Sequence, residues 1–515
     1  MPQAFWTIVL AFSMVAAYPY LHENVPFLQA HFRTYNKLGE ILLQANETSE
    51  QAALLPPPTV KPQEMPRLDA QDSTLTVQAV QRIEALTPEE VKTYTGGATA
   101  LAKFHAALQR VRKGGKCRIA YYGDSMIEGD LVTQSVRNEL QKAFGGIGVG
   151  FVPITSITNS FRRTVVHAFS PNWQTFNYLL PKKKQPYGIS GEYFLASPGS
   201  WVQYKASKQY AGVSSLTRPT LLYGKFPTDT ATKPLILTAA APAKADSASA
   251  TIDSGKLSQL VKDTTNTRAV VAAPLMRPSG KSPLAQRNYV VVTRPNKPAD
   301  TLDLNPVAAL NELRLSDTAT QDIRLDFHLQ AKIPLFGVDF EGGSGVYVDN
   351  FSSRGNTGQS LQALPAAMLK GMQAQHPYDL IVLQFGLNMI DSTRTNYYTY
   401  QQNLVRVITH LQQNFPNTAI LVVGVSDKAS KIKGEMQTNP CVPLISAAQR
   451  NAAIQTGAAF YNLFEAMGGY GSMVRWVNAT PALANKDYTH PNHLGAHKIA
   501  GMITKYLLTD FKEQP

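Results

Sequence analysis

The amino-acid sequence predicts an α/β protein in which a doubly wound parallel sheet is interrupted once by a β-rich inserted module. The chain has 515 residues, of which 44% are hydrophobic and 17% charged, as expected of a globular protein with more than one structural unit. Two patterns predict this fold. In the two outer parts of the chain, apolar runs alternate with segments whose apolar residues have helical spacing. The middle segment lacks long helical periodicity.

The two outer parts have the pattern of a parallel sheet. Continuous apolar runs, typical of strands that are buried on both faces, occur at residues 118–122, 379–385, 418–425 and 458–463. Apolar residues at helical spacing follow at 131–144, 400–415 and 493–511. Thr87 before Pro88 marks the start of an earlier helix. Strands that alternate with helices predict parallel strands joined by crossover helices.

The middle segment is rich in Thr, Ser, Pro and Lys, and its β-branched runs are short. They occur at 220–223, 235–238, 289–293 and 323–329, which predicts an all-β module. We therefore divide the folded chain into residues 71–151 and 340–515, which form the two parts of one α/β domain, and an inserted β-rich module at 152–339. Four aromatic residues of the module are expected either in its core or as platforms for sugars: Trp173, Tyr187, Tyr193 and Trp201.

The N-terminus resembles an export signal. Residues 4–17 are apolar and uncharged, but the run is shorter than the roughly 20 residues of a spanning helix, and Val15-Ala16-Ala17 offers a cleavage site. No Lys or Arg precedes the run, and an uncleaved anchor or a buried helix is the alternative. We expect a signal peptide or membrane anchor at 1–20 and a proline-rich linker at 21–70. The protein is then exported, periplasmic or secreted, with or without a membrane tether.

Charge and cysteine content restrict the partners. The formal net charge of +13 and the pI near 9.4 favour an acidic partner, but no nucleic-acid-binding signature accompanies them. The basic residues are spread out, so a solvated surface and a substrate-steering role both remain open. Neither Cys117 nor Cys441 has further ligands at metal-site spacing, so we expect no metal and no cofactor. The two cysteines could form one disulfide in an exported protein.

Ser125 is a candidate nucleophile. It follows an expected strand directly, in Gly123-Asp124-Ser125, and ligands of open α/β sheets bind at the carboxyl edge of the strands. Its backbone N–H at a helix N-terminus would stabilise a developing oxyanion. Asp124 or Ser125 could instead simply cap the following helix.

Two further motifs contain polar side chains of the kind that such a serine requires. Asn388 follows the expected strand at 379–385, after Gly386. Its carboxamide could donate a hydrogen bond to an oxyanion, or Gly386 and Asn388 could simply form an ordinary turn. Asp487 lies three residues before His490, close enough to orient the ring so that Nε2 accepts the serine proton. His493 and His497 are alternatives in the same stretch.

A fourth element, Gly355 in the loop sequence NFSSRGNTG, could present a backbone N–H to the same oxyanion. Together the four elements resemble the SGNH/GDSL hydrolase superfamily, whose four blocks supply Ser, Gly, Asn and an Asp-x-x-His pair. The resemblance covers roughly residues 115–150 and 340–510. It implies a flavodoxin-type sheet, the catalytic residues Ser125, His490 and Asp487, and an oxyanion hole formed by Ser125, Gly355 and Asn388.

The sequence departs from the family pattern at two points. Met126 replaces the usual Leu in the first block, and the second block lies much farther from the serine than is normal. An inserted β-module after GDSMIEGD makes the chain similar to bacterial peptidoglycan O-acetylesterases and related polysaccharide enzymes. The resemblance therefore implies a serine esterase that removes O-acetyl groups from a cell-wall or extracellular, peptidoglycan-like polysaccharide through an acyl-enzyme. The basic net charge favours an acidic polysaccharide.

Three other functions remain open. A polysaccharide O-acetyltransferase would use the same triad, and a glycan-binding protein could occupy a silent hydrolase scaffold. A lipase is less favoured because the sequence has no long apolar lid. The acyl group, the polymer and the oligomeric state are not determined by the sequence.

Overall fold

The computed structural model describes residues 87–179, 185–227 and 287–512. The expected signal or anchor at 1–20, the linker at 21–70 and the strand at 235–238 lie outside these residues. In the described ranges, the helices are all too short or too polar to span a bilayer.

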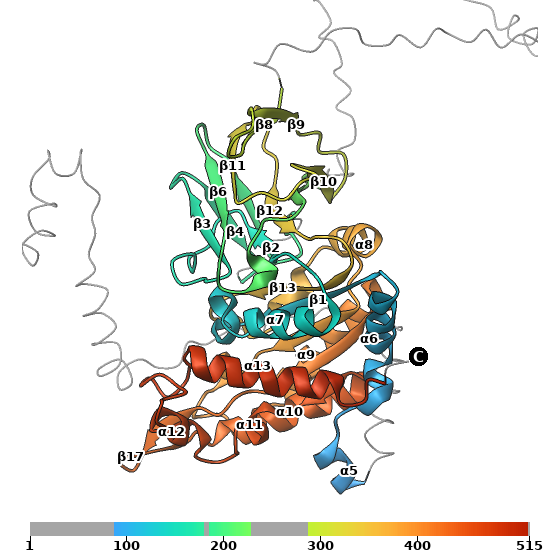
Figure 1. The fold of residues 1–515 in the computed structure, drawn as a ribbon. Helices are drawn as coiled ribbons and strands as arrows, with labels where there is room; N and C mark the ends of the chain where they lie inside the picture. Colours follow the sequence, from blue (N-terminus) through green and yellow to red (C-terminus); the bar gives the residue numbers. More distant parts are fainter. Residues whose placement is uncertain (1–86, 180–184, 228–286, 513–515) are drawn as a thin grey trace, which may run out of the picture. The chain divides into compact units, whose positions relative to one another are not determined.

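The α/β domain is built on a parallel sheet of five strands (Figure 1). The strands are β1 (Lys116–Gly123), β13 (Gly345–Ser352), β14 (Leu380–Gln384), β15 (Ala419–Val423) and β18 (Ala459–Tyr461). They lie in the order β13-β1-β14-β15-β18, and every neighbouring pair is parallel. This is the flavodoxin-like order, second-first-third-fourth-fifth, of a doubly wound sheet. The predicted fold class is thus confirmed.

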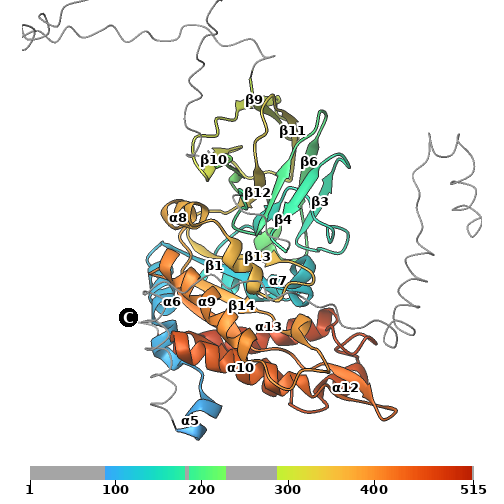
Figure 2. The same cartoon turned by 180° about the vertical axis from the view of Figure 1, so that it is seen from behind.

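Helices cover both faces of this sheet. In Figure 1, α7 (Thr133–Phe144) and α13 (His493–Leu508) lie in front of it, and the view from behind in Figure 2 shows α8 (Ala366–Gln375) and α9 (Tyr398–Asn414). Successive residues of β1 alternate between the two cores. The remaining helices are α5 (Pro88–Thr93), α6 (Gly97–Arg112), α10 (Cys441–Thr456), α11 (Leu463–Ala466) and α12 (Ser472–Val477).

The middle segment forms two antiparallel sheets that share one hydrophobic core. The first has the order β10-β7-β12-β5-β4, with β2 paired to β12, and the second has the order β3-β6-β11-β8-β9. The strands are β2 (Gly150–Pro153), β3 (Val165–Phe169), β4 (Gln174–Asn177), β5 (Glu192–Leu195), β6 (Trp201–Ala206), β7 (Pro219–Tyr223), β8 (Tyr289–Thr293), β9 (Asp300–Asp303), β10 (Asn311–Arg314), β11 (Asp322–His328) and β12 (Leu335–Phe340).

The β-rich module enters and leaves the α/β domain at one place. β2 and β12 are antiparallel neighbours, with Gly150 opposite Phe340. Because the first and last strands lie side by side, the insertion between α7 and β13 leaves the parallel sheet continuous. Among the four aromatic residues singled out above, Tyr187 and Tyr193 are buried in the core, and Trp173 and Trp201 are half-buried.

The structure corrects one local expectation and decides the open question of the cysteines. The helix expected from residue 131 begins at Thr133, and Ser125–Asp130 forms a separate 3₁₀ segment, η1. Cys441 is the first residue of α10. Both cysteines are buried and free, so the structure contains no disulfide between them.

Candidate active site

The topology brings three of the four predicted elements to one edge of the sheet. Ser125 follows β1, Asn388 follows β14, and the Gly355 turn follows β13. β1 lies between β13 and β14 in the sheet, and these parallel strands end at the same edge. In sheets of this order, ligands bind at the carboxyl edge beside the first strand, where the strand order reverses. The fold therefore places Ser125 at the position where such a sheet binds its ligand.

Ser125, His490 and Asp487 form a continuous chain of hydrogen bonds. Ser125 Oγ lies 2.8 Å from His490 Nε2, and His490 Nδ1 lies 2.7 Å from Asp487 Oδ2. The other oxygen of Asp487 accepts from the backbone N–H groups of His490 and Thr489, each at 3.0 Å. Burial alone would raise the pKa of Asp487, but the hydrogen bonds from His490 and Thr489 outweigh burial and lower it. The carboxylate is thus held ionised against the ring, which orients Nε2 towards the serine.

The turn that holds this pair has an unusual backbone. Tyr488, between the two residues, has φ of 54°, a left-handed conformation that costs a bulky residue of the order of 1–3 kcal/mol. The alternative histidines do not face Ser125 in this way. His497 Nδ1 lies 3.2 Å from Ser135 Oγ, and His493 begins α13 with its side chain exposed.

Asp124 is the helix cap, which leaves the Ser125 side chain free for His490. Asp124 Oδ1 accepts from the N–H of Met126 at 3.0 Å, at the start of η1. Its other oxygen accepts from Asn388 Nδ2 at 3.1 Å, and the same Nδ2 donates to the carbonyl of Asn356 at 3.0 Å. Asn388 thus links the serine segment, residues 123–130, to the turn that contains Gly355. The role of Asp124 as this acceptor was not anticipated from the sequence, although the residue lies in the serine motif.

The glycines near the site differ in their surroundings. Gly386 has φ of 129°, and a Cβ there would lie 2.9 Å from Val425 Cβ, so the turn before Asn388 requires glycine. Gly355 is exposed with φ of 77°, and beyond its chain neighbours no atom lies within 4 Å of a Cβ placed there. The nearby Gly358 is buried and donates its N–H to Asn356 Oδ1 at 2.8 Å. The oxyanion role of Gly355 stays a prediction.

The buried position of Asp124 gives a testable pH dependence. Burial raises the pKa of Asp124 from 3.8 to about 6, although the Met126 N–H, His490 and Asn388 oppose this shift. The folded protein therefore holds this proton more tightly than the unfolded chain. The resulting stabilisation is complete below pH 3.8 and is lost as the pH rises through about 6, a change of about 3 kcal/mol.

Asp124→Asn removes this titration. We expect the variant to gain about 3 kcal/mol of unfolding free energy relative to wild type between about pH 4 and about pH 8. Denaturant unfolding of both proteins at the two pH values measures the difference. A difference that does not change with pH, or that changes in the opposite direction, would contradict the assigned burial.

A second group of titratable side chains lies at the junction with the β-rich module. Ligand atoms of Asp339, Glu341 and His376 lie within 4.8 Å of one another. However, Glu341 is bonded by Arg118 at 2.6 Å and by Lys116 at 2.9 Å. These cations already compensate the carboxylate and would repel a metal ion, so the group is an ion-pair network that joins the two parts of the fold.

One part of the chain matches a known protein family. Residues 335–498 match the GDSL-like lipase/acylhydrolase family. This match contains Gly355, Asn388, Asp487 and His490 and begins after Ser125, which the inserted module separates from them. No curated protein matches the chain in sequence.

One solved structure extends the likeness in fold over the inserted module. A structure described as a peptidoglycan O-acetylesterase in action is 19% identical, with a TM-score of 0.57, and the match covers 81% of this chain and 97% of that one. An acetyl xylan esterase is 17% identical over 31% of this chain and 79% of its own, with a TM-score of 0.23. A family two carbohydrate esterase from Cellvibrio japonicus is 9% identical over 67% and 98%, also at 0.23. Only the first of these TM-scores indicates a shared fold.

The family match and the fold point to one class of protein. Residues 335–498 are similar to GDSL-like lipases and acylhydrolases, and the described chain shares the fold of a solved structure described as a peptidoglycan O-acetylesterase. The sequence motifs predicted both the superfamily and the resemblance to O-acetylesterases.

Proposed function

We propose that the protein is a serine esterase that removes O-acetyl groups from a cell-wall or extracellular polysaccharide through an acyl-enzyme on Ser125. The observation that carries the proposal is the hydrogen-bonded chain from Ser125 through His490 to Asp487. Its position at the carboxyl edge beside β1 adds support. An activated serine in this setting suits acyl transfer and requires no cofactor.

The reaction has two halves. His490 accepts the hydroxyl proton at Nε2 while Ser125 Oγ attacks the acetyl carbonyl carbon. The tetrahedral intermediate collapses when the ester C–O bond breaks, and His490 gives the proton to the departing sugar oxygen. Water then attacks the acetyl-serine while His490 accepts a proton from it, and acetate leaves as Ser125 recovers its hydrogen. The side chains of His490 and Asp487 are 35% and 47% exposed, so water has access to the base.

The oxyanion would be held by the backbone N–H groups of Ser125 and Gly355 and by the side chain of Asn388. Asn388 Nδ2 already donates to Asp124 and to the Asn356 carbonyl. The oxyanion would therefore replace one of these acceptors during the reaction. Because a negatively charged oxygen is a stronger acceptor than a carbonyl, we expect the bond to Asn356 to be exchanged.

Asn388→Ala tests this role. The variant should lose about 10²–10³ in kcat, the usual effect of removing one oxyanion donor. Steady-state hydrolysis of 4-nitrophenyl acetate measures the loss, and Asn403→Ala, on α9, is the matched control. An Asn388→Ala variant with wild-type kcat would show that Asn388 serves only to join the loops.

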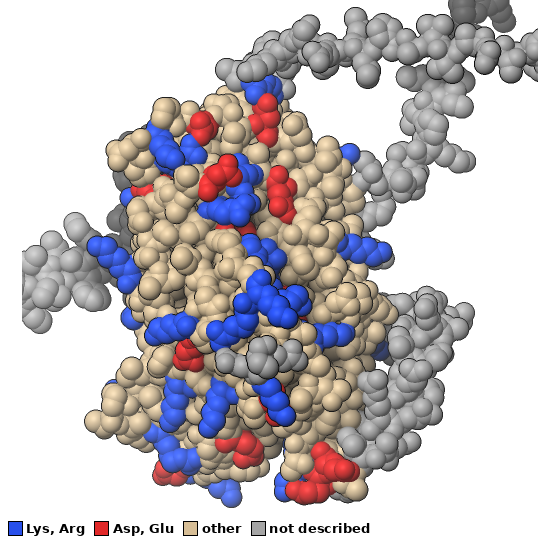
Figure 3. Space-filling model, turned by 45° about the vertical axis from the view of Figure 1, so that its right-hand side comes forward, with Lys and Arg blue, Asp and Glu red and all other residues tan. Residues whose placement is uncertain are grey.

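The substrate is proposed from the whole architecture. A TM-score of 0.57 over 81% of the chain includes the inserted module, and the protein matched is described as a peptidoglycan O-acetylesterase. An acetylated polysaccharide is the corresponding substrate class here, and export to the periplasm or cell surface would bring the enzyme to it. On the face in Figure 3, Lys and Arg side chains lie close together across the middle, and Asp and Glu side chains lie mainly towards the upper and lower ends.

Acetate release from acetylated peptidoglycan and from acetylated exopolysaccharides tests the function, with Ser125→Ala as the control. We expect release from at least one polymer by the wild type alone. If acetyl groups move to an added glycan without release of acetate, the protein is an O-acetyltransferase. If neither reaction occurs and the glycan still binds, the protein is a binding module on a hydrolase scaffold.

A further inference from the structure

A cavity of about 230 Å³ lies between the β-rich module and the serine segment. Glu128 and Gly129 of η1 form one side, and Ser353 and Arg354 of the turn after β13 form another. Ser353 also donates its N–H to the carbonyl of Gly123, the first residue of the serine motif, at 3.0 Å. The volume is below the roughly 300–1,000 Å³ of sites for whole drug-sized ligands. The cavity therefore suits one substituent or sugar unit of a longer substrate.

The wall contributed by the β-rich module is polar and includes one buried cation. Hydroxyl and amide side chains predominate there: Thr155, Ser156, Thr158, Thr175, Asn177 and Ser190. The loop between β2 and β3, residues 154–164, adds Arg162, whose side chain is only 7% exposed. Arg162 Nε donates to Thr164 Oγ1 at 3.1 Å. Its Nη2 has no hydrogen-bond partner among the described residues.

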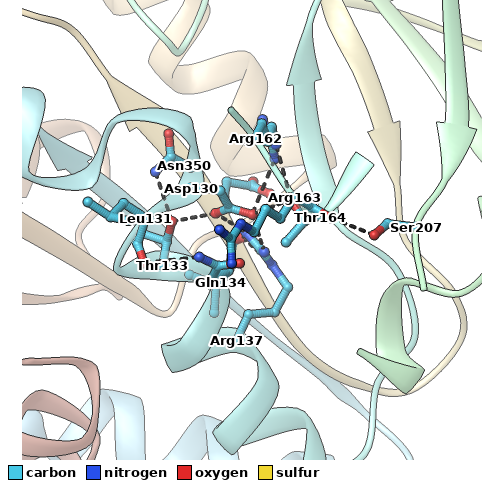
Figure 4. Close-up of polar contacts among 12 residues, drawn as sticks. Asp130, Leu131, Thr133, Gln134, Arg137, Arg162, Arg163, Thr164, Ser207 and Asn350 are labelled. Atoms are coloured by element: carbon cyan, nitrogen blue, oxygen red, sulfur yellow. Dashed lines mark hydrogen bonds and ion pairs between the residues drawn. The ribbon is translucent and has the colours of Figure 1, made fainter. Parts of the chain in front are cut away.

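Arg162 lies beside the buried ion pair between Asp130 and Arg137 (Figure 4). Asp130, which is fully buried, accepts from Arg137 Nη1 at 2.7 Å and Nη2 at 3.0 Å, and from Thr164 Oγ1 at 2.6 Å. It also accepts from Thr133 Oγ1. Arg162 Nη2 is 3.6 Å away from the same carboxylate. Asp130 thus lies beside two buried guanidinium groups, but only that of Arg137 forms hydrogen bonds with it.

No other carboxyl group described at the cavity bonds to Arg162. Asp349 accepts from the Phe151 N–H at 2.8 Å and from Tyr378 Oη at 2.6 Å. Glu128 is paired with Arg354. Burial raises the pKa of Glu192 to about 7, so near neutral pH a large share of this side chain is protonated and can donate a hydrogen bond. Burying a cation costs free energy when no anion pairs with it and accepts its hydrogen bonds. An anion that enters the cavity would reduce this cost.

The same loop carries a second cation, Arg163. Burial lowers the pKa of His493, the first residue of α13, and the positive charge of Arg163 lowers it further.

We propose that this cavity is the subsite for a carboxylate group of the polysaccharide, with Arg162 as its buried counter-ion. The proposal rests on the proposed esterase function and adds that the substrate is an acidic glycan, such as a uronic-acid polymer or another carboxylate-bearing chain. A carboxylate in the cavity would accept from Arg162 Nη2 and from the surrounding hydroxyl groups. The acetylated hydroxyl group of the same or a neighbouring sugar would then lie beside η1, near Ser125.

The test compares two acetylated oligosaccharides, an oligogalacturonate with carboxylates and a neutral xylo-oligosaccharide. We expect kcat/KM of the wild type to favour the acidic glycan, and Arg162→Met to lower this preference at least about tenfold, because a charged hydrogen bond is lost. Lys205→Met, which removes an exposed cation of β6, should keep the wild-type preference.

A second pair of variants leaves Arg162 in place. Thr175 is exposed on β4 and lines the cavity, so Thr175→Glu should repel a carboxylate and lower the preference, whereas the neutral Thr175→Gln should not. This pair decides the question if Arg162→Met fails to fold. Calorimetric binding of the unacetylated oligogalacturonate to the same variants gives an answer that does not depend on hydrolysis.

The possible failures are distinguishable. Hydrolysis of both glycans with the same preference in Arg162→Met, Thr175→Glu and wild type would overturn the subsite and leave the esterase intact. Binding of oligogalacturonate that depends on Arg162, without any acetate release, would overturn the esterase and support the subsite. Equal binding by wild type and Thr175→Glu would show that the cavity does not recognise the carboxylate.

Discussion

Ser125→Ala should reduce kcat for ester hydrolysis by about 10⁵–10⁶. The hydroxyl oxygen is the atom that forms the acyl-enzyme, and Ser125 Oγ is the group 2.8 Å from His490 Nε2. Losses of this size follow removal of the serine of a triad, and they do not add when the histidine is removed as well. Turnover of 4-nitrophenyl acetate by Ser125→Ala, His490→Ala and the double variant measures the effect.

The control for this series is Ser214→Ala, which changes an exposed serine of the β-rich module. It should retain wild-type kcat. If the double variant lost the product of the two single effects, Ser125 and His490 would act independently, and the hydrogen-bonded triad would not be the catalytic unit.

Arg137→Met should cost about 3–5 kcal/mol of unfolding free energy. The side chain is 1% exposed, and its guanidinium bonds both oxygens of Asp130 as well as the Val348 carbonyl of β13. Burial raises the pKa of Asp130, but Arg137 and Arg162 outweigh burial and lower it to about 2. The stabilisation is therefore present above pH 3.8 and is lost as the pH falls through about 2.

Denaturant unfolding near neutral pH measures this loss. Arg394→Met is the matched control, because Arg394 pairs with Asp391 at 3.2 Å on the surface, with the two side chains 50% and 43% exposed. Breaking an exposed pair should cost less than about 1 kcal/mol. Equal effects of the two substitutions would mean that the buried network contributes no more than a surface ion pair.

The parallel sheet was largely predictable because four of its five strands coincide with apolar runs in the sequence. β13 was not predicted, although it is buried over almost its whole length, because Asp349 and Asn350 interrupt its pattern. Both are satisfied by distant partners: Asp349 accepts from Phe151, and Asn350 donates to the Ile127 carbonyl. Contacts of this kind join segments separated by the inserted module, and local periodicity does not reveal them.

The candidate site shows a similar division. The residue types and their order predicted Ser125, Asp487 and His490, which the fold places in hydrogen-bonding contact. The sequence did not predict that Asp124 and the Asn356 carbonyl would bind the Asn388 amide. It also did not predict Arg162 as a buried cation, because its neighbours Asp130 and Arg137 precede the inserted module and only the tertiary fold brings them together.

The central claim is that Ser125 is the residue that carries the acyl group. A fluorophosphonate reacts with an activated serine and marks the residue for peptide mass spectrometry. We predict that the wild-type protein is labelled at Ser125, that labelling is strongly reduced in His490→Ala, and that it is lost in Ser125→Ala. No labelling of a folded wild-type protein, or labelling of another residue that persists in Ser125→Ala, would contradict this account.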